Sequence, residues 1–158
     1  MATFNEDRSA ASVAELLVLN TFSAMTDKYI FRDVTNNPEC YYKGDILAIE
    51  RATGREIWIE VKNDSRIAET RNVLCEEDYW SDYHQEIIRG NMHCDGDIYC
   101  VVSQSERKIY VIDYALLRAK YKNGIYKIIP HDTQTTFCYL CSLHQITEWG
   151  AGITVIEY

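Results

Sequence analysis

Two apolar segments joined by a short turn constrain the fold of this chain more than any other feature. Residues 41–50 and 56–62 both have the pattern of β-strands, and the five residues between them include Gly54, which suits a hairpin loop. Alternate residues of a strand lie on the same face of a sheet. In the second segment this rule predicts a core-facing side made of Ile57, Ile59 and Val61. The chain is therefore expected to build a β-sheet around this hairpin.

The remaining segments predict a mixture of helices and strands around that sheet. Apolar residues recur at three-residue steps between residues 9 and 26, which is typical of a helix with one buried face. That face is expected to consist of Val13, Leu16, Leu19, Phe22 and Met25. Further helices are expected at 79–89, closed by Gly90, and at 113–121, and further strands at 29–34, 97–102, 108–112, 126–129, 136–140 and 152–156. The expected fold class is α/β or α+β, with a mixed β-sheet flanked by helices.

Length and composition agree with a single globular domain spanning residues 1–158. The chain is 47% hydrophobic and 25% charged, and no apolar run approaches the ~20 residues of a membrane-spanning helix. The first residues lack the basic start and apolar stretch of a secretory signal, so we expect a soluble, cytoplasmic protein without membrane contact. The six cysteines are expected to be reduced and mostly buried, because a domain of this size does not need disulfides.

The hairpin also carries an unusual set of charged residues. Glu60 and Lys62 lie two positions apart and therefore share a face of the second strand, while Asp45 stands near the start of the first strand. In an antiparallel pair the start of one strand lies beside the end of the other, so Asp45 and Glu60 are expected to converge. Two neighbouring carboxylates repel each other unless a cation lies between them, and oxygen ligands select Mg²⁺ or Mn²⁺. Such an ion would polarise a phosphodiester, and the Lys62 ammonium would orient the attacking water.

A surface ion pair is the alternative explanation for Glu60 and Lys62. On a solvated sheet such a pair contributes less than ~1 kcal/mol to stability and has no catalytic role. Glu-x-Lys on its own occurs in many exposed strands, so the surrounding sequence has to decide between the two explanations.

The spacing of the charged residues resembles the PD-(D/E)XK, or restriction-endonuclease-like, superfamily of nucleases. Gly44-Asp45 is followed by fourteen residues and then by Glu60-Val61-Lys62, although the proline of the family name is replaced by Gly44. The resemblance implies that Asp45, Glu60 and the backbone carbonyl of Val61 bind a divalent metal ion. It also implies that Lys62 positions the nucleophile.

Glu15 has two alternative roles. Many members of the superfamily carry a glutamate on the helix before the hairpin that joins the metal site, and Glu15 occupies the matching position. The other role is structural. If Ser12 caps the helix, Glu15 falls three residues later, where the acid of a capping box belongs, and Ser9 is a second possible cap.

Downstream segments resemble a subgroup of phage and bacterial nuclease-like proteins. Lys62-Asn63-Asp64, Thr70-Arg71-Asn72 and Glu76 follow that subgroup's pattern of Lys-x-Asp, Thr-Gly-Asn and an acid, except that Arg71 replaces the glycine. The likeness covers about residues 9–121, so residues 122–158 are expected to add C-terminal strands to a restriction-endonuclease-like core. Asn72 and Lys43 are candidate substrate-binding residues.

The net charge of −8 is the wrong sign for a protein that binds phosphates by bulk attraction. A bound Mg²⁺ would supply positive charge locally, so the first hypothesis is a magnesium-dependent nuclease with DNA as its substrate. The alternative is a non-catalytic interaction protein that keeps the nuclease-like fold. A homodimer or a basic partner protein could supply the missing grip on DNA. A third hypothesis is hydrolysis of RNA or a small molecule by the same metal chemistry.

A zinc site is the last alternative considered. The spacing of His131, Cys138, Cys141 and His144 matches four zinc ligands. However, residues three apart on a strand face opposite sides, so the two sulfurs would converge only at a turn. Burial in an apolar strand is the preferred explanation of both cysteines.

Overall fold

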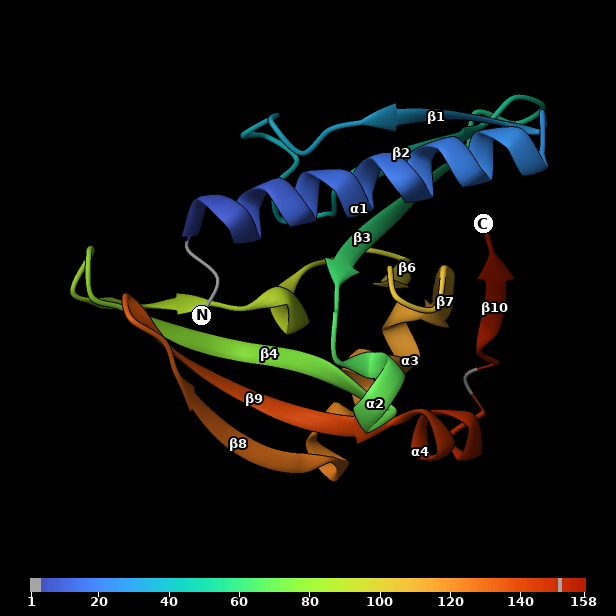
Figure 1. Cartoon of the computed structure of the whole chain (residues 1–158). Helices are drawn as coiled ribbons and strands as arrows, with labels where there is room; N and C mark the ends of the chain where they lie inside the picture. Colours follow the sequence, from blue (N-terminus) through green and yellow to red (C-terminus); the bar gives the residue numbers. More distant parts are fainter. Residues whose placement is uncertain (1–3, 151) are drawn as a thin grey trace.

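The protein has a mixed α+β structure built from two β-sheets (Figure 1). The computed structural model describes the backbone of residues 4–150 and 152–158, and the side chains of these residues from residue 10 onward. In spatial order, the six-stranded sheet consists of β1 (Tyr29–Asp33), β2 (Ile46–Glu50), β3 (Glu56–Asn63), β6 (Ile98–Ser103), β7 (Lys108–Asp113) and β10 (Thr154–Glu157). No helix of the described part is long and apolar enough to cross a membrane.

The predicted hairpin lies in the six-stranded sheet. β2 pairs antiparallel with β3, with Ile46 opposite Ile59, and β3 pairs parallel with β6. The other neighbouring strands are antiparallel, which confirms the prediction of a mixed sheet. The first strand of the hairpin begins at Ile46 rather than at residue 41. Residues 41–44 instead form turns, in which Lys43 N donates to Cys40 O at 2.8 Å.

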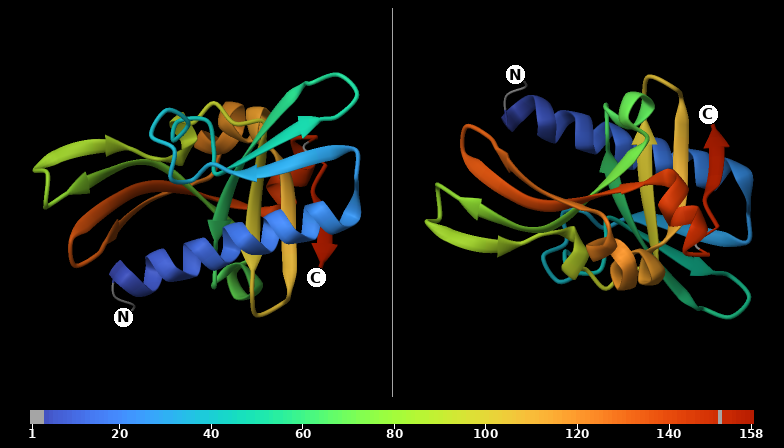
Figure 2. Two further views of the ribbon diagram at one scale, coloured as in Figure 1. Left: turned by 90° about the horizontal axis from the view of Figure 1, so that it is seen from above. Right: turned by 90° about the horizontal axis from the view of Figure 1, so that it is seen from below.

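Helix α1 (Phe4–Met25) covers one face of this sheet (Figure 2). Ala14 and Val18 are fully buried against Ile59 and Val61 of β3, so the core-facing side of the second strand is confirmed. The expected helix face is only partly right: Leu19 and Phe22 pack against the core, but the other three predicted residues are exposed, namely Val13, Leu16 and Met25. The apolar residues are spread around α1, so their three-residue steps did not identify the buried face. The described backbone places Phe4 at the start of the helix.

The protein has a second sheet, whereas the sequence predicted only one. In spatial order it consists of β5 (Glu86–Arg89), β4 (Asn72–Ser81), β9 (Gln134–Ser142) and β8 (Ile125–Pro130). The strand predictions for residues 126–129 and 136–140 are confirmed, but β9 pairs with β4 and β8 pairs with β9, so neither strand extends the first sheet. The helix predicted at 79–89 is wrong. Tyr79, Trp80, Ile87 and Ile88 are aromatic or β-branched and pair across the β4–β5 hairpin instead.

Short helices close the second core, between the two sheets. α3 (Tyr114–Lys120) confirms the helix predicted at 113–121, and Asp113 caps it by accepting from Leu116 N at 2.9 Å. α2 (Ile67–Thr70) links β3 to β4, and α4 (Leu143–Glu148) follows β9. The capping box of Ser142 and Gln145 starts α4, a signal present in the sequence but not used. The apolar residues of this core include Val73, Cys75, Tyr99, Val101, Tyr110, Tyr114, Leu117, Cys141 and Ile146.

Gly44 explains why glycine precedes Asp45. Its φ of +147° is a backbone conformation that other residues rarely adopt, and a Cβ there would lie 2.7 Å from Ile59 O. We expect Gly44→Ala to reduce the free energy of unfolding by about 3 kcal/mol or more, because backbone strain and steric overlap add. The measurement is urea denaturation followed by circular dichroism.

Gly54→Ala is the matched control for this prediction. Gly54 also has a positive φ, of +72°, but no atom lies within 4 Å of a Cβ placed there. We expect a loss of about 1 kcal/mol, from backbone strain alone. Equal losses in the two variants would contradict the close packing of Gly44 on β3.

Candidate functional site

Asp45 and Glu60 lie close together at the end of the β2–β3 pair where β2 begins. Asp45 directly precedes β2, and Glu60 belongs to β3. Asp45 N donates to Ile59 O at 2.9 Å, and Val61 N donates to Asp45 Oδ2 at 2.8 Å. The Asp45 carboxylate therefore takes the place of a further β2 residue beside β3. Glu60 and Lys62 lie on the face of β3 opposite to Ile59 and Val61, as their spacing predicted.

The backbone carbonyl of Val61 also faces this edge. Within a strand, the N–H and C=O of one residue point toward the same neighbouring strand. Val61 N donates to Asp45, so Val61 O points to the same side. β2 does not reach this level of the sheet, because its first residue, Ile46, lies opposite Ile59. The carbonyl thus lies on the side of β3 that carries the Asp45 carboxylate.

The two carboxylates are held in an environment that disfavours their charge. Burial raises the pKa of Asp45 to about 6, with the hydrogen bond from Val61 N opposing the rise and the charge of Glu15 adding to it. Burial and the charge of Asp45 also raise the pKa of Glu60 well above its usual range. No described residue donates a hydrogen bond to the Glu60 carboxylate in this structure. The site therefore contains closely placed, buried acids, and Glu60 among them has no donor in the described part of the chain, an arrangement that a cation would stabilise.

Glu15 reaches the edge of this site from α1. The Thr35 hydroxyl donates to Glu15 Oε2 at 3.1 Å and also lies 3.4 Å from Asp45 O. Burial raises the pKa of Glu15, and its charge in turn raises the pKa values of Asp45 and Glu60. The capping role considered for Glu15 is wrong, since Ser9 and Ser12 lie inside the helix and not at its start.

Lys62 is paired with an acid of the second sheet. Its Nζ lies 2.6 Å from Glu76 Oε1, with side chains that are 31% and 20% exposed respectively. Burial alone would lower the pKa of Lys62, but the charge and hydrogen bond of Glu76 outweigh it and raise the pKa. The amine is therefore held in its charged form. The sequence marked Glu76 only as part of a subgroup pattern and gave it no role.

The local fold of β4 fixes the position of Glu76. The pairing of β4 with β9 shifts register between Glu76 and Asp78, which is a β-bulge that re-aims side chains. Glu76 N donates to Asn91 Oδ1 at 3.0 Å, and Asn91 Nδ2 contacts the Tyr99 hydroxyl at 2.8 Å. Gly90 packs so closely that a Cβ there would lie 2.4 Å from Glu76 O. Gly90 therefore supports Glu76 and does not end a helix, as had been expected.

The donor set fits a hard divalent cation better than any other group. Asp45, Glu60 and the Val61 carbonyl offer only oxygen atoms, the ligands that Mg²⁺ and Mn²⁺ prefer. Among the described residues, no three His, Cys, Asp or Glu side chains are close enough to hold a metal on their own. A metal at Asp45 and Glu60 would therefore need the carbonyl and water or substrate oxygens, and Mg²⁺ usually keeps several such waters.

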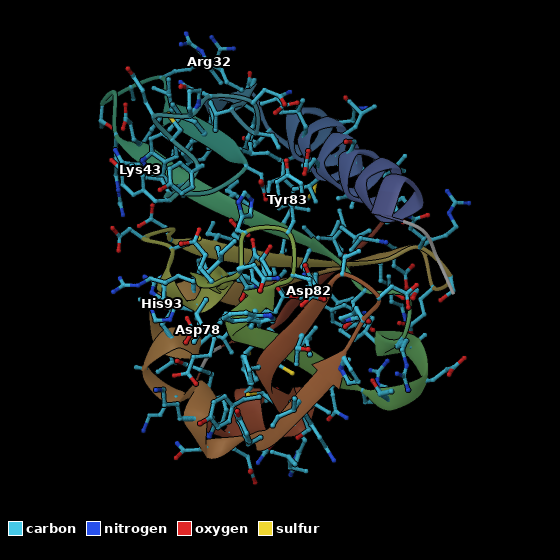
Figure 3. The ribbon with its side chains drawn as sticks, turned by 90° about the vertical axis from the view of Figure 1, so that its left-hand side faces the viewer. Arg32, Lys43, Asp78, Asp82, Tyr83 and His93 are labelled. Atoms are coloured by element: carbon cyan, nitrogen blue, oxygen red, sulfur yellow. The ribbon has the colours of Figure 1, made fainter. Side chains whose placement is uncertain are left out.

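The remaining predicted residues lie at the periphery of the site. Lys43 Nζ is 4.7 Å from the centre of the Trp58 ring, and Trp58 shares the strand face of Glu60. Figure 3 shows Lys43 on the opposite side of the view from α2, where β4 begins with Asn72. Asn72 lines a cavity next to Lys62. The structure thus places Lys43 and Asn72 toward different ends of β3.

Arg71 occupies the position where the subgroup pattern has glycine. Its φ is +55°, the left-handed conformation that ends α2, and glycine adopts this conformation without strain. The Arg71 side chain has a structural role instead. Its Nη1 lies 3.1 Å from the Tyr110 hydroxyl and 3.2 Å from Glu106 Oε1, which ties the loop to β7.

The four residues considered as zinc ligands are dispersed. Cys141 Sγ packs 3.8 Å from Cys75 Sγ in the core between the sheets, whereas Cys138 Sγ contacts Lys127 O on the other face of β9. His144 Nε2 pairs with Glu148 at 3.3 Å. The strand pleat separates the two sulfurs, as the sequence argument predicted.

Comparison with known proteins supports the fold. No protein-family model matches the sequence, and no curated protein sequence matches it. Among solved structures, a bacterial homing endonuclease, I-Ssp6803I, is similar with a TM-score of 0.51 and 12% identity over 82% of this chain and 76% of that chain. The likeness shows a shared fold. D212, a nuclease from a fusselovirus, aligns over 94% of this chain and 93% of its own at 12% identity, with a TM-score of 0.39.

Proposed function

We propose that this protein is a divalent-metal-dependent nuclease of the PD-(D/E)XK type, with DNA as its substrate. The observation that carries the proposal is the convergence of Asp45 and Glu60 at one strand end, beside the charged amine of Lys62. The solved structure that shares the fold is described as a homing endonuclease, which favours DNA over other phosphodiesters.

The residues of this chain divide the work of hydrolysis. Asp45, Glu60 and the Val61 carbonyl would hold Mg²⁺ or Mn²⁺. Glu15 would add negative charge at the edge of the site, from α1. The ion would polarise the phosphodiester and lower the pKa of a bound water. Lys62, kept protonated by Glu76, donates hydrogen bonds to the attacking water or to the charged phosphoryl oxygens. Glu76 is a positioning residue, because it contacts Lys62 and acts through it.

The overall charge limits how such an enzyme would hold DNA. With a net charge of −8, bulk attraction for phosphates is unfavourable, so binding depends on local cations and the metal. A homodimer or a basic partner protein would enlarge the positive surface. We expect DNA affinity without a divalent ion to be weak.

Metal titration combined with cleavage tests the proposal. Mn²⁺ and Mg²⁺ are titrated into the wild-type protein and into a Glu60→Ala, Lys62→Ala double variant, and cleavage of plasmid, single-stranded and branched DNA is followed. We expect the wild type to bind metal and cleave, and the variant to do neither. A wild-type protein that binds no metal would overturn the nuclease proposal and favour the non-catalytic interaction protein.

A further inference from the structure

A cavity of about 270 Å³, lined by both apolar and polar side chains, opens next to Lys62. It lies between the loop that follows β3 and one face of the second sheet. Its lining consists of Lys62, Asn63, Asp64, Ser65, Arg66, Thr70, Asn72, Leu74, Ile129, His131, Thr136 and Leu140. Neither α2 nor the hairpin β8–β9 is part of the Asp45–Glu60 pair, so the cavity is a separate feature that shares only Lys62 with the site.

The cavity has the opposite charge balance to the protein as a whole. Its lining includes Arg66, the histidine His131, and Lys62, whose amine is already paired with Glu76. Asp64 is the one acid of the lining, and its Oδ1 already accepts a hydrogen bond from Arg66 N at 2.8 Å. Arg66 is therefore the cation of the lining that has no acidic partner among the described residues.

Several donors in the cavity have no partner among the described residues. The Arg66 guanidinium, the Asn72 side-chain amide and the His131 ring make no hydrogen bond or ion pair with a described residue. Two arginines elsewhere in the chain differ in this respect. Arg51 Nε donates to Asp27 O at 2.7 Å and Arg118 Nη1 donates to Gly96 O at 2.8 Å. The free donors of the cavity therefore remain available for an external acceptor.

We propose that this cavity binds one phosphate group of a nucleic-acid strand, adjacent to the phosphate that is cleaved. The inference rests on the proposed function, since it uses the nearby Lys62 to place the cavity beside the reaction centre. A guanidinium, an amide and an imidazole are donors that suit a phosphate with several acceptor oxygens. The volume, just below the ~300 Å³ at which small-molecule pockets begin, suits one nucleotide unit and excludes a duplex.

Strand geometry gives this phosphate a direction relative to the cleavage site. Glu60, Lys62 and the loop at Asp64–Arg66 follow one another along the chain as β3 ends. A nucleic-acid strand that runs from Glu60 toward Arg66 would therefore place its scissile phosphate at Asp45 and Glu60 and a neighbouring phosphate in the cavity. Arg66 supplies local positive charge, which compensates for the missing basic surface.

Binding of phosphate itself is the first test. Inorganic phosphate and thymidine monophosphate are titrated into the wild-type protein without divalent metal, and the four histidine ring signals are followed by NMR, with His131→Gln used to assign that of His131. We expect only the His131 signal to move. His144, paired with Glu148, and His93, paired with Asp78, serve as internal controls. Uniform movement of all four, or none, would overturn the proposal.

Binding of an oligonucleotide is the second test. Fluorescence anisotropy of a labelled single-stranded DNA is measured in EDTA against salt for the wild type, Arg66→Ala and Asn72→Ala. Arg55→Ala is the matched control, since Arg55 is an exposed arginine at the opposite end of β3. We expect Arg66→Ala to weaken binding about tenfold, as expected when a hydrogen bond to a charged group is lost. It should also reduce the salt slope by about 0.7.

The two proposals can fail separately. If Arg66→Ala and Asn72→Ala bind like Arg55→Ala, the cavity is not a phosphate site, even when the wild type cleaves DNA. If binding depends on Arg66 but no DNA is cleaved with Mn²⁺ or Mg²⁺, the cavity is a phosphate site, but the nuclease proposal fails and with it the placement beside a cleaved phosphate. We expect Arg66→Ala to keep its fold, because Arg66 is exposed and its side chain is not part of the core. Circular dichroism of each variant checks this.

Discussion

Asp45→Asn is expected to reduce DNA cleavage at least about a thousandfold, since it removes a charged ligand from a metal that supplies several kcal/mol. The same variant is expected to be more stable than the wild type above pH 6 when no metal is present. Asparagine keeps a carbonyl oxygen for the hydrogen bond from Val61 N, and it removes a charge that burial and Glu60 make unfavourable. Loss of activity with a gain in stability separates a functional acid from a structural one.

The pH dependence of the wild type follows from the direction of the Asp45 shift. The pKa of Asp45 rises from 3.8 to about 6 on folding, so the folded state favours the protonated acid. This contribution to stability is fully present below pH 3.8 and is lost as the pH rises through about 6. We expect metal-free wild-type protein to lose roughly 1 to 3 kcal/mol across this window relative to Asp45→Asn. Mg²⁺ or Mn²⁺ should restore this lost stability in the wild type and not in Asp45→Asn.

Thermal denaturation at several pH values, with and without metal, measures both effects. Glu69→Gln is the control, because Glu69 is an exposed acid on α2 outside the group of acids around Asp45. Parallel stability curves for the wild type and Asp45→Asn between pH 4 and 7 would show that Asp45 is not held in a charge-disfavouring site. The metal proposal would then lose its physical basis.

The sequence predicted the parts of this site that depend on local spacing. Strand alternation placed Glu60 and Lys62 on one face, and antiparallel pairing brought Asp45 beside them. These rules work over a few residues, because a strand has a fixed period and a hairpin has a fixed direction. The structural need for glycine at position 44 was not predicted, because it does not arise from local spacing. Its requirement for glycine comes from contact with Ile59 O across the hairpin, which no local pattern encodes.

The second sheet could not be predicted from local spacing. Tyr79 to Arg89 contains apolar residues at spacings compatible with a helix or a strand, and the pairing with β9, more than fifty positions further along the chain, decided for a strand. Glu76 was therefore left in an unassigned segment. Its contact with Lys62 depends on the bulge in β4 and on Asn91, and neither was visible from spacing.

Lys62→Ala is expected to reduce cleavage about a hundred- to a thousandfold, the loss typical of removing one positioned donor from a reaction centre. Glu76→Gln should have a smaller effect at neutral pH and a distinct signature at high pH. Without the charge of Glu76, the burial that lowers the pKa of Lys62 is opposed only by the charges of Glu60 and Asp64, so the pKa should fall. The alkaline limb of the pH–rate profile should then move to lower pH, because Lys62 loses its proton earlier.

A double-variant cycle distinguishes positioning from simple loss of stability. If Glu76 acts through Lys62, the Lys62→Ala, Glu76→Gln variant should cleave no more slowly than Lys62→Ala alone. The pair of Lys28 and Glu50, 2.9 Å apart with Lys28 59% exposed, provides the control, and Glu50→Gln should leave the profile unchanged. Titration of the Lys62 side chain by NMR gives a readout independent of cleavage. An unchanged Lys62 pKa in Glu76→Gln would mean that Glu76 contributes to the fold and not to the charge state of the amine.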